Sequence, residues 1–287
     1  MTTGNRTDHL PAGQDSVANG VTALGRFGRA LTQWLPAAIV VAAVLGLWEG
    51  YVRLFDVQRW LLPAPSIIAK TVAESPGLLW RHSLVTLEEV VVGFGLALAL
   101  GVLLASSIAL SRTLERAIYP FIIASQTIPI IVIAPLLLVW VGYGLTPKVI
   151  VVALIAFFPI VVNMVDGLKS VDPDAVNLMR TLGARRWQIF LKVQMPSAMP
   201  FLFSGTRVAI AVSVIGAVIG EWVGSSEGLG YLMIRSKPQF LTERVFAAIA
   251  ILSMMGIVLF LLVGLAERMV IPWWHSERRS RQATREN

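Results

Sequence analysis

Six long apolar segments constrain this chain more than any other feature of its sequence. Each approaches or exceeds the ~20 residues that an α-helix needs to cross the hydrocarbon core of a bilayer. The segments are Leu35–Phe55, Leu84–Leu110, Ala117–Val141, Thr146–Val165, Phe201–Val223 and Val245–Ile271. Only 14% of the 287 residues are charged, against about 25% in soluble domains. We therefore predict an all-α integral membrane protein with six transmembrane helices.

The distribution of basic residues predicts how these helices are oriented. An even number of spans places both termini on the same side of the membrane. Eight of the 24 Lys and Arg residues then fall on the opposite side: Arg53, Arg59, Lys70, Arg81, Lys148, Arg235, Lys237 and Arg244. The other sixteen lie on the side of the termini, so the positive-inside rule predicts that both termini are cytoplasmic. The net charge of +7 is then explained by topology, which disfavours nucleic-acid binding.

The chain divides into three parts by composition. Residues 1–33 are polar, and we predict that they form a disordered cytoplasmic N-terminus. Residues 34–274 contain all six apolar segments and form the transmembrane domain, while residues 275–287 are a short charged cytoplasmic tail. The first apolar segment lacks a small-residue cleavage pattern, so we interpret it as an uncleaved span and not as a signal peptide.

Signals for catalysis or metal binding are weak. The chain has no cysteine, which excludes disulfides and thiolate ligands. Residues 224–228, GSSEG, match the G-x-S-x-G pattern, but they follow a membrane span and not the strand that a nucleophile elbow requires. His82 has no second ligand at helical spacing, so no metal site is expected.

Polar residues inside the spans are candidates for a translocation pathway, because placing them in lipid is costly. The candidates are Gln126, Thr127, Asn163, Ser213 and Glu221. The charged residues that we find in or beside the spans lie near their ends, whereas ion-coupled carriers usually hold ionisable groups near the midplane. The shortage of ionisable groups near the midplane therefore favours an energy source outside the chain.

Three glycines recur at four-residue spacing in the fifth span: Gly216, Gly220 and Gly224. The spacing places them on one helix face, where another backbone can approach closely. Packing within the chain and contact between subunits explain the pattern equally well.

A basic insert, residues 171–196, interrupts the apolar pattern. Asp172 can cap a helix that begins at Pro173, and Gly183 can adopt the left-handed conformation that ends it. The apolar face of this helix consists of Ala175, Leu178, Met179 and Leu182. A second helical stretch follows and is expected to stop at Pro196. An amphipathic helix at the membrane surface is one explanation; the stop at Gly183 favours a knob that contacts a cytoplasmic partner.

The insert resembles the signature loop of ATP-binding-cassette importer permeases, E-A-A, three residues, Gly, nine residues, I-x-L-P. Here Gly183 is followed by nine residues and then by Val193-Gln194-Met195-Pro196, while Asn177-Leu178-Met179 replaces the E-A-A triplet. The stretches LPAPS, ASQTIPIIVIAPLLLVWVGYG and GEWVGSSEGLGYLM resemble the branch for nitrate, alkanesulfonates, taurine and thiamine-pyrimidine precursors. The resemblance covers roughly residues 35–274.

The resemblance implies a type I importer permease fold in a bacterial inner membrane. It further implies two permease subunits, identical or paralogous, two cytoplasmic ATPase subunits and an extracytoplasmic binding protein that docks at the first long loop and at residues 224–240. The chain has no G-x-x-x-x-G-K-[ST] phosphate loop, so it is not an enzyme, binds no cofactor itself, and leaves ATP and Mg²⁺ to the partner. The implied ATPase-coupling residues are Leu178, Met179, Leu182, Gly183, Ala184, Arg185, Arg186 and Pro196.

The resemblance leaves the substrate open. A thiamine-pyrimidine precursor or a related aromatic heterocycle is the leading interpretation, and nitrate, an alkanesulfonate or taurine is the alternative. A secondary carrier and a membrane scaffold without transport are the rival classes, but neither explains the spacing between Gly183 and Pro196.

Overall fold

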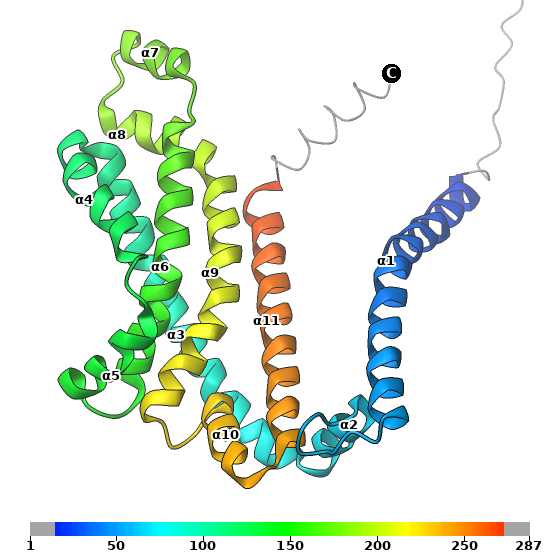
Figure 1. Cartoon of the computed structure of the whole chain (residues 1–287). Coiled ribbons are helices and arrows are strands. Elements are labelled where there is room, and N and C mark those ends of the chain that lie inside the picture. Colours follow the sequence, from blue (N-terminus) through cyan, green and yellow to red (C-terminus); the bar gives the residue numbers. More distant parts are fainter. Residues whose placement is uncertain (1–14, 273–287) are drawn as a thin grey trace, which may run out of the picture. The chain divides into compact units, whose positions relative to one another are not determined.

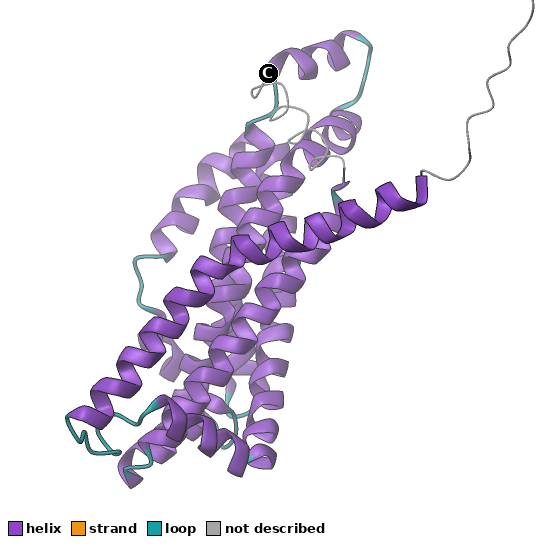
Figure 2. Ribbon diagram, turned by 90° about the vertical axis from the view of Figure 1, so that its right-hand side faces the viewer, coloured by secondary structure: helices purple, strands orange, loops and turns teal. Residues whose placement is uncertain are grey.

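The computed structural model describes residues 15–272, with side chains from residue 35 onward. Helices joined by loops make up this part of the chain, with no strand in it, as predicted (Figure 2). The chain divides into two compact units at Ser66. The first unit contains α1, and the second contains α3 and every later helix.

The helices have the following bounds. They are α1 Asp15–Leu54, α2 Pro65–Glu74, α3 Pro76–Leu110, α4 Arg112–Ser125, α5 Ile130–Val141, α6 Leu145–Lys169, α7 Pro173–Thr181, α8 Arg186–Ile189, a π-helical turn Phe190–Gln194, α9 Met195–Gly224, α10 Leu229–Ser236, a 3₁₀ turn Lys237–Gln239 and α11 Thr242–Val270. Among the described residues, five helices are long and apolar enough to cross a membrane, or six if the bent pair α4–α5 is one span.

The predicted third span, Ala117–Val141, consists of a pair of helices, α4 and α5, in place of one continuous helix. The chain bends by 101° between α4 and α5. Pro129 explains the break, because it has no N–H to donate and disfavours the helical conformation at Ile128. The two halves are therefore separate helices joined by residues 126–129.

The start of the chain also departs from the prediction. Because α1 already begins at Asp15, residues 15–33 are helical, although the sequence predicts disorder for them. Their content of Ala, Leu and Arg favours helix, and adding residues to the helix of the first span avoids a new nucleation step. The rest of the predicted N-terminal segment, residues 1–14, and the predicted tail, 275–287, lie outside the described residues.

Helix α6 lies at the centre of the second unit and packs against α3 through small residues. The stripe on α3 consists of Gly93, Ala97, Gly101 and Ala105, four residues apart. A Cβ at Gly93 would come within 2.5 Å of the Val152 side chain, and one at Gly101 within 2.8 Å of Ile160. Glycine at these positions lets the two helix backbones approach closely.

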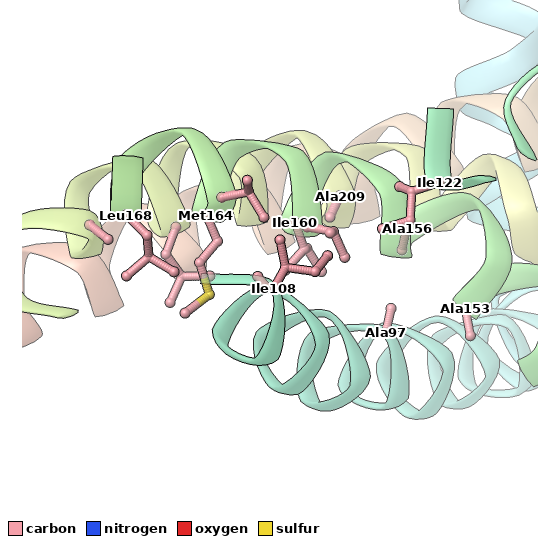
Figure 3. Packing of buried hydrophobic residues seen from close by; sticks show 14 of the residues in the cluster. Ala97, Ile108, Ile122, Ala153, Ala156, Ile160, Met164, Leu168 and Ala209 are labelled. Carbon is pink, nitrogen blue, oxygen red and sulfur yellow. The ribbon is translucent and has the colours of Figure 1, made fainter. Parts of the chain in front are cut away.

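The apolar core fills the space around α6. Its most buried members include Ala156, Ile160 and Met164 on α6 and Ile108 on α3. Figure 3 shows the Ile160 and Met164 side chains directed toward Ile108. On its other side α6 packs against α9, where Ala209 belongs to the same core. The bundle is thus built around one helix that contacts both neighbours along most of its length.

The two ends of this bundle carry different short elements. Helices α7 and α8 lie at one end, together with the end of α11, and α10 lies at the opposite end (Figure 1). Between them α9 runs the length of the bundle beside α6 and α11. We refer to these as the α7 end and the α10 end.

Candidate functional site

The α7 end is formed by the basic insert. The Asp172 side chain accepts a hydrogen bond from the Asp174 N–H at 2.9 Å, and Pro173 occupies the first turn of α7. The helix is nine residues long. Short helices are marginal in isolation, so this capping helps to define where α7 begins.

Gly183 ends α7 in a defined turn. Its φ is 77°, a conformation that costs an L-residue about 1–2 kcal/mol. Its N–H donates to Arg180 O at 2.9 Å, and the Ala184 N–H donates to Met179 O at 3.0 Å. This pair of bonds is the Schellman arrangement that satisfies the last carbonyls of a helix. Gly183 therefore fixes the direction in which the chain leaves α7.

The apolar face of α7 is open to solvent in the single chain. Leu178 is 61% exposed and Leu182 is 72% exposed, while Met179 is partly buried. Arg185 and Arg186 follow and are exposed as well. An apolar knob beside two positive charges is a surface suited to another protein.

The second half of the insert does not end at Pro196. Helix α8, the π-helical turn and α9 follow one another directly, and Pro196 lies in the first turn of α9. The Met195 N–H donates to Phe190 O, five residues back. This wider turn directly precedes the proline, which lacks an N–H for an ordinary helical bond. The prediction of a stop at this proline is therefore wrong.

An apolar groove of about 790 Å³ runs between α5, α9 and α11. Its lining is almost entirely aliphatic, with Trp222 and Phe260 as the aromatic residues and Ser253 as the polar one. Trp222, near the α10 end of α9, is 42% exposed. The groove offers apolar walls and two flat rings, but no charged side chain.

The candidate pathway residues fall in different environments. Gln126 and Thr127 are exposed in the bend between α4 and α5. Asn163 on α6 donates to Pro159 O at 2.8 Å, and Ser213 on α9 donates to Ala209 O at 2.7 Å, so both are bonded to their own helices. The single chain does not bring these four side chains into one site.

Glu221, the fifth candidate, lies inside the protein at the end of α9 and is 1% exposed. Thr86 Oγ1 donates to Oε1 of Glu221 at 2.5 Å. The N–H groups of Gly230 and Tyr231 donate to Oε2 at 2.5 and 3.1 Å. Because these two amides belong to the first turn of α10, the carboxylate lies against the positive end of that helix. Its neighbour Trp222, not Glu221, lines the groove.

A buried ion pair lies in the same region. Lys148 Nζ donates to Glu89 Oε1 at 2.5 Å and to Ser225 Oγ at 2.9 Å. The Glu89 side chain is 0% exposed and that of Lys148 is 10% exposed. Sequence reasoning missed this pair, although Glu89 and Lys148 both lie inside predicted spans, because Lys148 was counted only as a basic residue on the side opposite the termini. No group of three His, Cys, Asp or Glu side chains suited to a metal ion occurs among the described residues.

A second ion pair connects α9 to α11 nearer the α7 end. Arg207 and Glu267 are 2.5 Å apart, and the Arg207 guanidinium lies 5.6 Å from the Phe260 ring centre. A Cβ at Gly264 would lie 3.2 Å from an Arg207 nitrogen, so the glycine leaves room for the guanidinium. Each of these two side chains compensates the charge of the other, and either charge alone would be costly in lipid.

The glycine stripe of the fifth span packs within the chain. A Cβ at Gly216 would lie 3.0 Å from Val152 Cα, and one at Gly220 would lie 3.2 Å from Lys148 Cα. A Cβ at Gly224 would come within 2.6 Å of the Leu138 side chain. The stripe thus brings α9 close to α6 and α5.

Comparison with known proteins decides the family. Residues 97–272, more than half of the chain, match the family of binding-protein-dependent transport system inner membrane components. The chain belongs to that family. The resemblance seen in the sequence is confirmed: this is a multi-pass permease subunit of an ATP-binding-cassette importer, and ATP hydrolysis belongs to a separate ATPase.

Two curated relatives extend over almost the whole chain. The formylaminopyrimidine transport permease protein ThiX of Halalkalibacterium halodurans is 40% identical, over 84% of this chain and 96% of its own length. The riboflavin transport system permease protein RibX of Chloroflexus aurantiacus is 38% identical, over 90% of this chain and 96% of its own. The similarity to these two permeases therefore extends well beyond the insert.

A solved structure shows the same fold. A chain of the MetNI methionine ABC transporter, in an inward-facing conformation, superposes with a TM-score of 0.59 at 21% identity, covering 67% of this chain and 96% of that one. This likeness confirms the predicted type I importer permease fold.

Proposed function

We propose that two copies of the permease form the translocation pathway of an importer for an aromatic nitrogen heterocycle, with a thiamine-pyrimidine precursor as the leading substrate. A separate ATPase, with two copies in the complex, binds the α7 end in the cytoplasm. An extracytoplasmic binding protein delivers the substrate at the α10 end. Closure and reopening of the ATPase pair switch the pathway between its two sides.

The observation that carries the proposal is the exposed apolar face of α7. Leu178 and Leu182 are largely exposed, and the Gly183 turn holds them in a defined orientation. Exposing apolar side chains to water is unfavourable, and a second protein that covers this face would remove them from water. The neighbouring Arg185 and Arg186 would add electrostatic attraction to an acidic rim on the ATPase.

The basic residues of the insert support the orientation. Arg180, Arg185, Arg186 and Lys192 lie in the insert, and Lys169 is the last residue of α6, directly before it. A concentration of Lys and Arg in short loops is typical of the cytoplasmic side. The end of α11 lies at the same end of the bundle (Figure 1), in agreement with a cytoplasmic C-terminus.

The groove between α5, α9 and α11 supports a pathway formed by two copies. Its volume of about 790 Å³ is within the range of small-molecule sites. A second permease facing it would close the groove and exclude lipid. Gln126 and Thr127 in the α4–α5 bend, with Asn163, Ser213 and Glu221, remain our candidates for polar residues along the pathway.

The relatives support the choice of substrate. ThiX and RibX are named for formylaminopyrimidine and riboflavin, both of which contain a nitrogen heteroaromatic ring. The rings of Trp222 and Phe260 in the groove can stack on such a substrate. No Arg or Lys lines the groove, which disfavours nitrate, alkanesulfonates and taurine as cargo.

Reconstitution tests the proposal. The permease is purified with its ATPase, subunit masses are measured, and the complex is placed in vesicles with its binding protein. We expect two copies of each subunit, no hydrolysis by the permease alone, and ATP-dependent uptake of a radiolabelled aminopyrimidine that excess taurine does not inhibit. Uptake without the ATPase would identify a secondary carrier, and inhibition by taurine or nitrate would identify the alternative substrates.

A further inference from the structure

We propose that Glu221, Thr86 and His82 are positioning residues that clamp the start of α10 onto α9 and α3. The clamp makes α10 a rigid extension of these two helices, so that a contact made on α10 is transmitted to the groove. This inference rests on the proposed function in one respect, namely that the binding protein docks at the α10 end.

The clamp consists of four consecutive backbone amides, residues 228–231. The first amide donates to His82 Nδ1 at 2.9 Å and the second to Thr86 Oγ1 at 2.9 Å. The last two donate to Oε2 of Glu221. The first amides of any helix have no partner within that helix. Here each one is satisfied by a side chain of another helix, in a buried region.

Two glycines let α10 begin directly on the carboxylate. A Cβ at Gly228 would overlap the carboxyl group of Glu221, and one at Gly230 would lie 2.9 Å from its Oε2. Gly228 also has a φ of 113°, which disfavours any residue with a side chain. The backbone is thus shaped to bring its N–H groups onto Glu221.

A second tie holds the loop between α9 and α10. Lys148 on α6 donates to Ser225 Oγ at 2.9 Å, and Ser225 Oγ in turn donates to Glu227 O at 2.5 Å. Glu227 also pairs with Arg81 of α3. The start of α10 is therefore bonded to α3, α6 and α9 together, although only four residues separate α9 from α10.

The clamp lies between the surface of α10 and the groove. On one side is a polar pocket of about 290 Å³, lined by Arg81, His82, Glu227, Tyr231 and Arg235 among others. On the other side, Gly230 in the first turn of α10 lies against Val218 of α9, because a Cβ at Gly230 would come within 3.1 Å of Val218 Cα. Val218 is one of the residues that line the groove. A displacement of α10 would therefore act on Glu221 through its hydrogen bonds and on the groove through Val218.

The test compares Thr86→Val and Glu221→Gln with a matched control, Thr206→Val. Thr206 is also buried, but its hydroxyl donates only to Leu202 O of its own helix, at 2.7 Å. Each variant is prepared in lipid nanodiscs with the ATPase. Hydrogen exchange of amides 228–231 is measured by mass spectrometry, beside basal hydrolysis and hydrolysis stimulated by the loaded binding protein.

We expect amides 228–231 to exchange about tenfold faster in both clamp variants, a change that corresponds to about 1.4 kcal/mol. Stimulated hydrolysis should fall about tenfold in both clamp variants. In Thr86→Val, which changes none of the candidate pathway residues, basal hydrolysis should stay at the wild-type rate. Thr86→Ser retains the hydroxyl and should restore both readouts. Thr206→Val should match the wild type in both.

Two results would overturn the inference. Wild-type exchange in both clamp variants would show that the bonds do not hold α10. Faster exchange with full stimulation would show that the clamp transmits nothing. A wild-type complex that the binding protein fails to stimulate would instead contradict the proposed function. The exchange measurement needs no binding protein and therefore separates that outcome from the others.

Discussion

Replacing Gly183 by valine tests whether the insert couples the permease to its ATPase or is only an amphipathic helix at the membrane surface. The φ of Gly183 is 77°, and a Cβ there would meet no atom within 4 Å. The cost of the substitution is therefore conformational and not steric. It amounts to about 1–2 kcal/mol for an ordinary L-residue and is greater for a β-branched one. A penalty of this size lowers the population of the observed turn about 5- to 30-fold.

The loss should appear in coupling and not in folding. The turn lies at the α7 end, outside the packed core around α6, so Gly183→Val should insert and assemble like the wild type. Its binding to the ATPase, measured by pull-down, and its ATP-driven uptake into vesicles should each fall about tenfold. Gly183→Asn is the matched variant, because asparagine tolerates the left-handed conformation, and it should retain most of both activities.

Two results would refute this reasoning. Wild-type pull-down and uptake for Gly183→Val would mean that the insert contacts no ATPase. Equal losses for the valine and asparagine variants would mean that the size of the side chain matters, and not the backbone conformation.

Three further predictions test the packing and charges. Gly220→Leu should overpack the α6–α9 contact and lower stability by about 1–3 kcal/mol, whereas Val208→Leu on an exposed part of α9 should change the thermal midpoint little; equal midpoints would count against close packing. Lys148→Ala leaves the Glu89 carboxylate buried without its cation and should cost about 3–5 kcal/mol, which Glu89→Leu in the same chain should partly restore; a midpoint unaffected by Lys148→Ala would contradict the ion pair. Arg186→Ala should weaken ATPase binding more at low than at high salt, so an effect independent of salt would exclude an electrostatic role.

The long spans could be predicted from the sequence because their signal is strong. Twenty or more consecutive apolar residues have few alternatives to a membrane helix. The bounds of α6 and α11 lie within four residues of the predicted segments Thr146–Val165 and Val245–Ile271. The turn at Gly183 could be predicted as well, because Asp172 marks the start of a helix, the apolar face shows its period, and a glycine after the last apolar residue is a typical helix end.

The positions of helix breaks could not be predicted from the prolines alone. The predicted third span contains Pro120, Pro129 and Pro135, and only Pro129 separates two helices, while the other two lie inside α4 and α5. Pro196 was expected to end a helix but lies within the first turn of α9. Whether a proline ends a helix depends on neighbouring contacts and on wider turns such as the π-helical one, and neither is visible in a local pattern.

The partners of buried charges were beyond sequence reasoning for a different reason. Glu89 and Lys148 are 59 residues apart, and Thr86 and Glu221 are 135 apart. Their contacts depend on how α3, α6 and α9 pack, which is set by the small-residue stripes. The sequence identified Glu221 as a costly residue in a span; only the packing shows that the positive end of α10 compensates it.

Helix α9 is the element that connects the α7 end of the permease to its α10 end. It has 30 residues, which corresponds to about 45 Å at 1.5 Å per residue. At the α7 end it continues through the π-helical turn into α8 and the insert, and at the α10 end its Glu221 holds the start of the next helix. Between these ends, α9 lies against α6 through Gly216 and Gly220 and contributes Trp222 to the groove. If the ATPase binds the insert and the binding protein docks on α10, as proposed, both contacts act on one continuous helix, and that helix also carries the close packing, the clamp and part of the groove.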